Sequence, residues 1–179
     1  MKTPKAVKTN AARLLDSLGI AYEVQTYEVD PDDLSAIAVA RKIGLPPEQV
    51  FKTLLTCAAP VPGQRETPHF FAVIPGDAEL DLKKLAHAAE VKKVELASLK
   101  EVEPLTGYVR GGVTVMAART AFPAFADETI ELHDVVSVSA GQRGTQLVLA
   151  PADYLRATGA MLADLTKPMR AAAGGEAAH

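Results

Sequence analysis

The residue best suited to chemistry is Lys52, which carries a positive charge inside a short run of strand-forming residues, 51–57. Side chains alternate along a strand, so Lys52 shares one face with Leu54 and Cys57 lies on the other. A buried ammonium group loses stability or its proton unless an anion lies beside it. Lys52 therefore indicates one of two things: a packed stem whose ammonium reaches water, or a cation that lines a concave site and neutralises a phosphate or carboxylate.

Two glycine-rich segments are the next candidates for a binding site. Residues 107–114 contain a Gly-Gly pair, and residues 137–144 combine glycines with Ser139 and Arg143. Glycine lets a backbone approach a ligand closely because no side chain blocks it. A bulged strand with a tight turn explains the first segment equally well, and a hairpin turn explains the glycines of the second.

The common catalytic motifs are absent from the sequence. It contains no Gly-x-Ser-x-Gly elbow, no phosphate-binding P-loop, no Gly-x-Gly-x-x-Gly and no His-Glu-x-x-His. Cys57 is the only cysteine, and it is expected to be a buried, inert thiol. We therefore expect no metal and no cofactor. The expected site consists of backbone amides, hydroxyls and one or two cations, which orient a substrate and stabilise an oxyanion.

Composition places the chain among globular proteins with one domain. It has 179 residues, of which 48% are hydrophobic, and a formal net charge of −3. No apolar run approaches 18 residues and no secretory signal precedes the first helix, so we expect a cytoplasmic protein without a membrane segment. The folded domain is expected to cover residues 1–170, and the alanine- and glycine-rich residues 171–179 are expected to form a flexible tail.

The elements that must position these residues follow from apolar periodicity and from helix-capping and turn residues. In chain order they are a helix from Thr3 to Gly19, a strand over 20–27, a helix capped by Ser35 that ends at Gly44, a helical turn over 45–50, the strand 51–57, a loop over 58–68, the strand 70–74, a helix from its cap Asp81 to Ala89, strands over 122–126, 135–139 and 145–150, and a helix over 151–158. The many short strands predict an α+β fold with a single domain: a strongly curved mixed β-sheet that forms a barrel-like core surrounded by helices.

Five segments, taken in order, carry a resemblance to a known family. They are residues 27–30, 50–54, 75–84, 107–112 and 137–144. Together they resemble the YbaK/EbsC family of aminoacyl-tRNA deacylases, which is related to the editing domain of bacterial prolyl-tRNA synthetases. The likeness runs from about Pro4 to Leu165. It implies the barrel-like fold given above and hydrolysis of the ester that joins a wrong amino acid to tRNA.

The resemblance also implies roles for individual residues. Lys52 matches a family lysine that contacts the 3′ end of the tRNA electrostatically, and the backbone of Gly111 and Gly112 matches the loop that holds the terminal adenosine and the ester. In members that act on cysteine, the substrate's own thiol helps to break the ester, so no protein nucleophile is needed. The residues expected to bind the rest of the substrate are Tyr27, Ser35, Ile37, Thr114, Ser139, Gly141 and Arg143.

The chain departs from the family pattern at three places, one of which is Ala117-Ala118-Arg119, where many members have a basic pair. Thr114-Val115 stands where many members have Ser-Pro, and 35–37 stands where many have an aromatic residue beside the amino-acid pocket. We therefore expect trans-editing of cysteine or another small amino acid on the proline tRNA, with misacylated tRNA and prolyl-tRNA synthetase as partners. The alternatives are a non-catalytic module that binds the tRNA 3′ end or a synthetase, and an esterase for small molecules or nucleotides.

Overall fold

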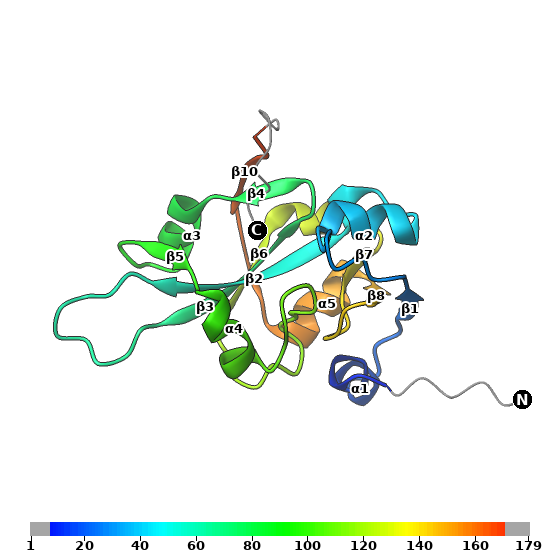
Figure 1. Cartoon of the computed structure of the whole chain (residues 1–179), viewed down its shortest axis with the longest axis horizontal. Helices are drawn as coiled ribbons and strands as arrows, with labels where there is room; N and C mark the ends of the chain where they lie inside the picture. Colours follow the sequence, from blue (N-terminus) through cyan, green and yellow to red (C-terminus); the bar gives the residue numbers. More distant parts are fainter. Residues whose placement is uncertain (1–7, 171–179) are drawn as a thin grey trace, which may run out of the picture.

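The computed structural model describes residues 8–170, in which short helices are interspersed among strands along the chain (Figure 1). The expected tail 171–179 and the expected start of the first helix at Thr3 lie outside the described residues. The helical segments are α1 (Asn10–Ser17), α2 (Ala36–Ile43), η1 (Pro47–Gln49), α3 (Leu82–Ala88), α4 (Leu99–Thr106), η2 (Glu128–Leu132) and α5 (Pro151–Thr158). Among residues 8–170, no helix combines the length and the apolar character needed to cross a membrane.

The strands form one mixed sheet and two smaller antiparallel sheets. In the mixed sheet, with the order β5-β2-β3-β6-β9, β2 is antiparallel to both of its neighbours, whereas β3, β6 and β9 are parallel. The second sheet has the order β1-β8-β7, and the third pairs β10 with β4. The bounds are β1 (Glu23–Thr26), β2 (Phe51–Ala58), β3 (His69–Pro75), β4 (Ala78–Leu80), β5 (Val94–Leu96), β6 (Ala124–Asp127), β7 (Val136–Ser139), β8 (Thr145–Leu149), β9 (Met161–Ala163) and β10 (Thr166–Pro168).

The expected α+β class with a mixed sheet is confirmed, but the strongly curved, barrel-like core is not observed. Within the described residues, the hydrogen-bonded strands fall into three separate sheets rather than one closed sheet. Among the described residues, backbone pairing between the mixed sheet and the β1-β8-β7 sheet is limited to a single parallel bridge between Val50 and Ser137, although both sheets contribute side chains to one core. A barrel requires continuous pairing around its circumference. One isolated bridge does not supply it, so the two sheets stay open and meet at an edge.

The mixed sheet is buried on both faces because its central strands carry apolar residues at successive positions. Val73 packs into a core that includes Leu15 of α1 and Tyr154 of α5, whereas its neighbour Ile74 packs into a second core with Leu85 of α3. Successive side chains of a strand point to opposite faces. A continuous apolar run such as 70–74 is therefore typical of a strand covered on both sides.

Capping residues explain where several helices begin and end. The Ser35 hydroxyl accepts a hydrogen bond from Ala38 N at 3.1 Å, and Gly44 ends α2 with φ at 75°. α1 begins at Asn10, where the Thr9 hydroxyl accepts a hydrogen bond from Ala12 N as the side-chain cap. These contacts fix the start of α2, which lies beside the cavity described below.

The sequence patterns missed helix α4 and four short strands, β4, β5, β9 and β10. The helix spans eight residues and contains Pro104, which removes a backbone donor and weakens the helical pattern. Its start is nevertheless stabilised by Ser98, whose N–H donates to the Glu101 carboxylate at 3.0 Å. The missed strands have three residues each. Such segments show no periodicity, and only tertiary pairing defines them.

Candidate active site

A cavity of about 530 Å³ lies where the mixed sheet meets the β1-β8-β7 sheet. It brings together five of the residues predicted from the sequence, which come from four separate parts of the chain. These five are Ser35, Ile37, Lys52, Gly111 and Ser139. The size suits a small organic group rather than a single ion. The cavity is therefore the candidate active site.

Lys52 lies on β2 and is half-buried. Its Nζ donates to Gly76 O at 3.5 Å, and among the described residues no carboxylate lies within ion-pair distance of it. Burial lowers the pKa of Lys52, and the more distant charges of Asp77 and Glu79 offset part of this effect. The ammonium thus carries a desolvation cost that an anion in the cavity would relieve.

The edge of β2 is open along this cavity. β5 pairs with β2 only at 56–58, and β7 meets the start of β2 through the bridge at Val50, so no strand pairs with residues 52–55 on the side away from β3. Leu55 O accepts from Ala97 N on that open side. Backbone groups alternate in direction along an antiparallel strand, so the N–H and C=O of Thr53 point the same way as those of Leu55. Thr53 lines the cavity and offers it a backbone donor and acceptor.

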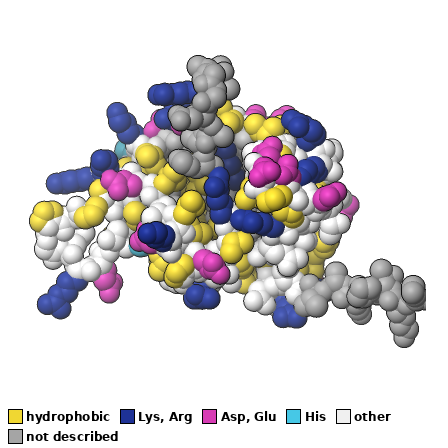
Figure 2. Space-filling view, viewed as in Figure 1, with side chains coloured by type: hydrophobic (Ala, Val, Ile, Leu, Met, Phe, Trp, Pro, Cys, Tyr) yellow, Lys and Arg dark blue, Asp and Glu magenta, His cyan; other side chains and the backbone are white. Residues whose placement is uncertain are grey.

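The lip formed by the start of α2 is acidic. Asp32 and Asp33 line the cavity together with Ser35. Hydrogen bonds from Ser35, including its N–H at 3.1 Å, lower the pKa of Asp33, so this carboxylate stays ionised. The space-filling view shows lysine and arginine side chains beside hydrophobic ones near the middle of the molecule (Figure 2). The cavity therefore presents charges of both signs around an apolar interior.

The two glycine-rich segments pack against each other at the edge of the cavity. A Cβ on Gly112 would lie 3.1 Å from the backbone of Gln142, and a Cβ on Gly141 would lie 2.8 Å from the Tyr108 ring. Arg143 Nε donates to Arg110 O at 2.8 Å and ties the segments together. Residues 107–113 form an irregular loop with a turn at 110–111 and no strand, so the bulged strand considered for this segment is wrong.

The hydrogen bonds of these segments decide which amides are free. The N–H of Gly112 donates to Val109 O at 2.9 Å, and that of Gly141 donates to the Ser139 hydroxyl at 3.1 Å. No such bond occupies the N–H of Gly111 among the described residues, and Gly111 lines the cavity with φ at 85°. Of the glycine pair, Gly111 has the available backbone donor, whereas Gly112 permits the close packing behind it.

The structure places the remaining predicted residues outside the cavity lining. The Tyr27 ring packs beside α2 with Lys42 Nζ 5.9 Å from its centroid. Thr114 is fully buried, and its hydroxyl accepts from Met116 N at 3.4 Å. Gly112, Gly141 and Arg143 support the wall rather than form it. Their contact with substrate stays a prediction.

Sequence patterns missed several residues that do line the cavity, notably Gly76 and Gln146. A Cβ on Gly76 would lie 2.8 Å from the Ala36 side chain, so this glycine lets β3 approach α2. The available signal for Gln146 is a polar residue at an inward position of an apolar strand, 145–149. Gln146 lies on a strand that the sequence predicts, whereas Gly76 lies just after the end of β3.

No cysteine or histidine of the described residues lines this cavity. Cys57, expected to be buried, is only half-buried, and burial raises the pKa of its thiol. Within residues 8–170 there is also no cluster of three or more His, Cys, Asp or Glu side chains that could hold a metal ion. The side chains around the cavity therefore suit binding and charge stabilisation better than nucleophilic attack.

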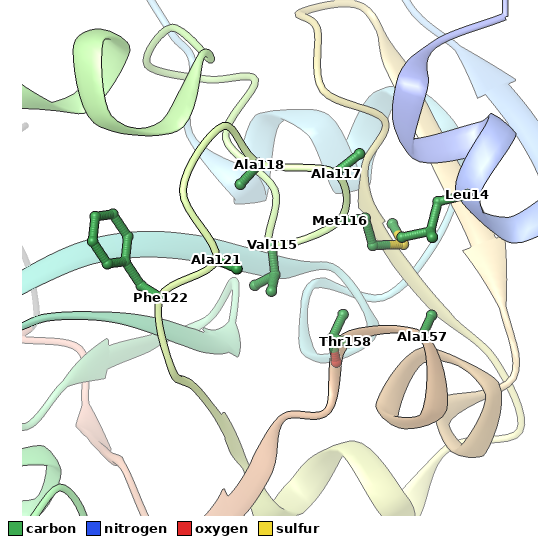
Figure 3. Close-up of a pocket in the computed structure, with 9 residues that line it drawn as sticks. All are labelled: Leu14, Val115, Met116, Ala117, Ala118, Ala121, Phe122, Ala157 and Thr158. Carbon is green, nitrogen blue, oxygen red and sulfur yellow. The ribbon is translucent and has the colours of Figure 1, made fainter.

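A second, smaller cavity of about 280 Å³ lies between α1, the segment 115–122 and α5 (Figure 3). Figure 3 shows mostly alanine and larger apolar side chains around it, with Thr158 as the polar exception. The Thr158 hydroxyl already donates to Tyr154 O at 2.9 Å. This cavity contains none of the residues predicted for the site and no charged side chain.

Comparison with known sequences identifies the family. Residues 30–157 match the model of the aminoacyl-tRNA editing domain. A protein of Enterococcus faecalis assigned as the Cys-tRNA(Pro)/Cys-tRNA(Cys) deacylase EbsC is 40% identical over 159 residues, which are 89% of this chain and 93% of that protein. The multifunctional Ser/Thr-tRNA deacylase ProXp-y of Escherichia coli K12 is 32% identical over 54% of this chain and 58% of its own length. A proline tRNA ligase of Lactobacillus gasseri is 28% identical over 67% of this chain and 22% of the ligase.

Solved structures support the same fold. The hypothetical protein APE2540 superposes with a TM-score of 0.77 at 24% identity, covering 88% of this chain and 99% of that one. A structure described as a trans-editing enzyme for prolyl-tRNA synthetase gives a TM-score of 0.71 at 24% identity, covering 90% and 99%. The expected family and its class of activity, deacylation of misacylated tRNA, are confirmed. The chain therefore belongs to the aminoacyl-tRNA editing domain family, as a homologue of the single-domain YbaK/EbsC deacylases.

Proposed function

We propose that this protein acts in trans on tRNA charged with the wrong small amino acid, with cysteine on the proline tRNA as the first candidate, and that the cavity around Lys52 holds the ester. The observation that carries this proposal is a half-buried lysine without a carboxylate partner among the described residues, at a cavity of about 530 Å³. A phosphate of the tRNA 3′ end supplies the missing anion.

The charges around the cavity match both ends of the aminoacyl group. The tRNA backbone is anionic and faces Lys52, whereas the free α-ammonium of an aminoacyl ester is cationic and finds the ionised Asp33 on the α2 lip. Opposite charges at fixed positions orient a substrate as well as attract it. This arrangement favours an aminoacyl ester over a neutral ester of similar size.

Hydrolysis needs no nucleophile from the protein. Water, or the thiol of a bound cysteine, attacks the ester carbonyl carbon, the carbon–oxygen bond to the ribose breaks, and the ribose oxygen takes up the proton. When the thiol attacks, the product is a cyclic thioester that water opens later. The free N–H of Gly111 and the outward N–H of Thr53 are the donors available for the developing oxyanion.

The proposed setting follows from the substrate. Charged tRNA is used in the cytoplasm, where we place the protein, and the relation to a proline tRNA ligase makes prolyl-tRNA synthetase the proposed partner. The proposed folded unit is 1–170. Gly112, Tyr27, Thr114, Gly141 and Arg143 are proposed to contact or shape the bound tRNA end from outside the cavity.

A panel of mischarged tRNAs tests the proposal. Purified protein should release cysteine, serine or alanine from the proline tRNA while leaving correctly charged prolyl-tRNA intact, and release is measured as loss of labelled aminoacyl-tRNA. Binding of tRNA without release of any amino acid would favour the non-catalytic module instead. Turnover of free aminoacyl esters at the same rate as aminoacyl-tRNA would favour a small-molecule esterase.

A further inference from the structure

Gln146 is a buried polar residue at the floor of the Lys52 cavity. It lies on β8, is 5% exposed, and is directly opposite Ser139 in the β7–β8 register. Its Oε1 accepts a hydrogen bond from the Ser137 hydroxyl at 2.9 Å. A buried glutamine without function is costly, since both halves of its amide need partners. Here the Oε1 of the amide has its hydrogen-bond partner in Ser137, which also fixes the orientation of the amide.

The other half of the amide opens into the cavity. Within the described residues, no hydrogen bond is formed by Gln146 Nε2, and the enclosed polar atoms without a partner are only His69 Nε2 and the Tyr154 hydroxyl. Gln146 itself lines the cavity. Its NH₂ group is therefore a donor that reaches the cavity space, held in place from behind by Ser137.

The register places this donor relative to Lys52. Val50, just before β2, forms a parallel bridge with Ser137 of β7. Side chains two residues apart on a strand share a face, so Lys52 and Ser139, each two residues beyond the bridge, lie on the same face. Ser139, at 9% exposed, and Gln146 are more buried than Lys52, which is half-buried. Lys52 thus lies towards the opening, and Gln146 lies deeper.

This depth limits which part of the substrate reaches Gln146. The phosphates and ribose of a tRNA end are bulky and charged, so they stay near the opening with Lys52. The amino-acid side chain is the part small enough to enter the deeper part of the cavity, whose lining also includes aliphatic residues such as Val50 and Val113. A donor among apolar walls distinguishes a side chain that accepts a hydrogen bond from one that does not.

We infer that Gln146, fixed by Ser137, is a specificity-determining residue whose Nε2 donates to the side-chain oxygen or sulfur of the bound amino acid. The site then favours side chains with an acceptor, a hydroxyl most strongly and a thiol less so, over the methyl group of alanine. This inference rests on the proposed function, because it assigns the substrate class of that same site.

The test compares seryl-tRNA with alanyl-tRNA, whose amino acids differ by one oxygen atom. Gln146→Met keeps the shape of the side chain and removes the donor. It should lower kcat/KM for the seryl substrate by about three- to tenfold, mostly through KM, and leave the alanyl substrate unchanged. Ser137→Ala, which frees the amide to rotate, should give a smaller loss with the same selectivity.

Gln25→Met is the matched control. Gln25 pairs with Gln146 across β1 and β8 but does not line the cavity, so its loss should affect neither substrate. Equal losses on both substrates, or no loss on either, would overturn the inference. If Gln146→Met fails to fold, as judged from its thermal unfolding, the Ser137→Ala variant decides by the same criterion.

A binding measurement separates this inference from the proposed function. Seryl and alanyl amides of 3′-amino-3′-deoxyadenosine cannot be hydrolysed as esters, and calorimetry reports their affinities directly. Wild type should bind the seryl amide about three- to tenfold more tightly, and Gln146→Met should remove the difference. Wild type that discriminates between the amides yet hydrolyses no charged tRNA contradicts the proposed function alone. Wild type that hydrolyses both substrates without discriminating contradicts only the role of Gln146.

Discussion

Lys52 is suited to bind an anion, because its ammonium group lines a cavity and is partly desolvated. A surface lysine keeps an ordinary pKa, whereas burial lowers the pKa of Lys52 and no carboxylate among the described residues pairs with it. Of the two possibilities raised by the sequence, a solvated ammonium or a cation lining a concave site, the cavity beside it favours the second. The cost of desolvation is recovered only when an anion binds.

Replacing Lys52 by methionine should weaken tRNA binding and slow deacylation without unfolding the protein. Methionine preserves the packed stem and removes the charge, so the loss should be electrostatic. If Lys52 contacts one phosphate of the single-stranded 3′ end, the plot of log K against log salt concentration should become shallower by about 0.7. The binding constant measured from 50 to 200 mM salt checks this.

Lys83→Met provides the control, since Lys83 is exposed on α3 and does not line the cavity. An unchanged salt slope in Lys52→Met would rule out the phosphate contact.

The pH dependence of tRNA binding has a definite sign. The lowered pKa means that the ammonium loses its proton at a lower pH than an ordinary lysine, so wild-type binding should weaken as pH rises through that value. Lys52→Met should lack this decline.

At the scale of elements, the site depends on segments that contribute few side chains of their own. The turn 107–113 and the hairpin turn after β7 hold each other through glycine packing and the bond from Arg143 to Arg110 O. The start of α2 adds a lip whose position is set by the Ser35 cap. A site of this kind is sensitive to backbone displacement, because the groups it uses are amides in fixed places.

Gly112→Ala should lower deacylase activity more than it lowers stability. The backbone of Gly112 needs no left-handed conformation, so the only conflict is the added Cβ at 3.1 Å from Gln142 C and Cα. Relieving that contact displaces the turn and the neighbouring Gly111 amide. Steady-state kinetics should show at least a tenfold fall in kcat/KM, about 1.4 kcal/mol of lost transition-state stabilisation.

Gly159→Ala is the matched comparison. Gly159 ends α5 with φ at 65° and has open space around it, so alanine there costs backbone strain of about 1 kcal/mol and touches no part of the site. Its melting temperature should fall while its activity persists. If Gly112→Ala loses stability and keeps activity in the same way, the glycine serves folding only.

For the whole molecule, local sequence signals predicted most elements but not their assembly. The strands around Phe51 and Phe71, and the helix capped by Ser35, follow from apolar runs and capping residues. The barrel was not found because sheet closure depends on pairing between distant strands, and the pairing between the two sheets stops at the Val50–Ser137 bridge. No local pattern encodes where such pairing ends.

The site was predicted in part for the same reason. Lys52 stood out because a charge in an apolar strand is unusual within its own segment, and the glycine pairs stood out as turn signals. Gln146 did not, since a glutamine in a strand is ordinary until Ser137 and the cavity are seen together. The family resemblance gave the list of candidate site residues, and the fold shows which of those residues line the same cavity.

Among the described residues, one of the two enclosed polar side-chain atoms without a hydrogen-bond partner lies in the core around α1 and α5, at Tyr154. The side chain is fully buried, and its hydroxyl forms no hydrogen bond of acceptable geometry within the described residues. Burial raises its pKa well above the ordinary value for tyrosine, and the nearby Thr53 side chain offsets only part of this effect. An unpartnered buried hydroxyl costs about 1–3 kcal/mol, whereas the ring itself packs between α5 and the sheets.

Tyr154→Phe keeps the ring and removes the unpartnered hydroxyl, so the free energy of unfolding should rise by about 1 kcal/mol. Urea unfolding of both proteins measures the difference, with Tyr22→Phe as a control because the Tyr22 hydroxyl donates to Asp16 at 2.9 Å and its loss should not stabilise. A loss of stability in Tyr154→Phe would mean that the hydroxyl has a partner in solution, with the neighbouring Thr53 of the active-site strand as the first candidate.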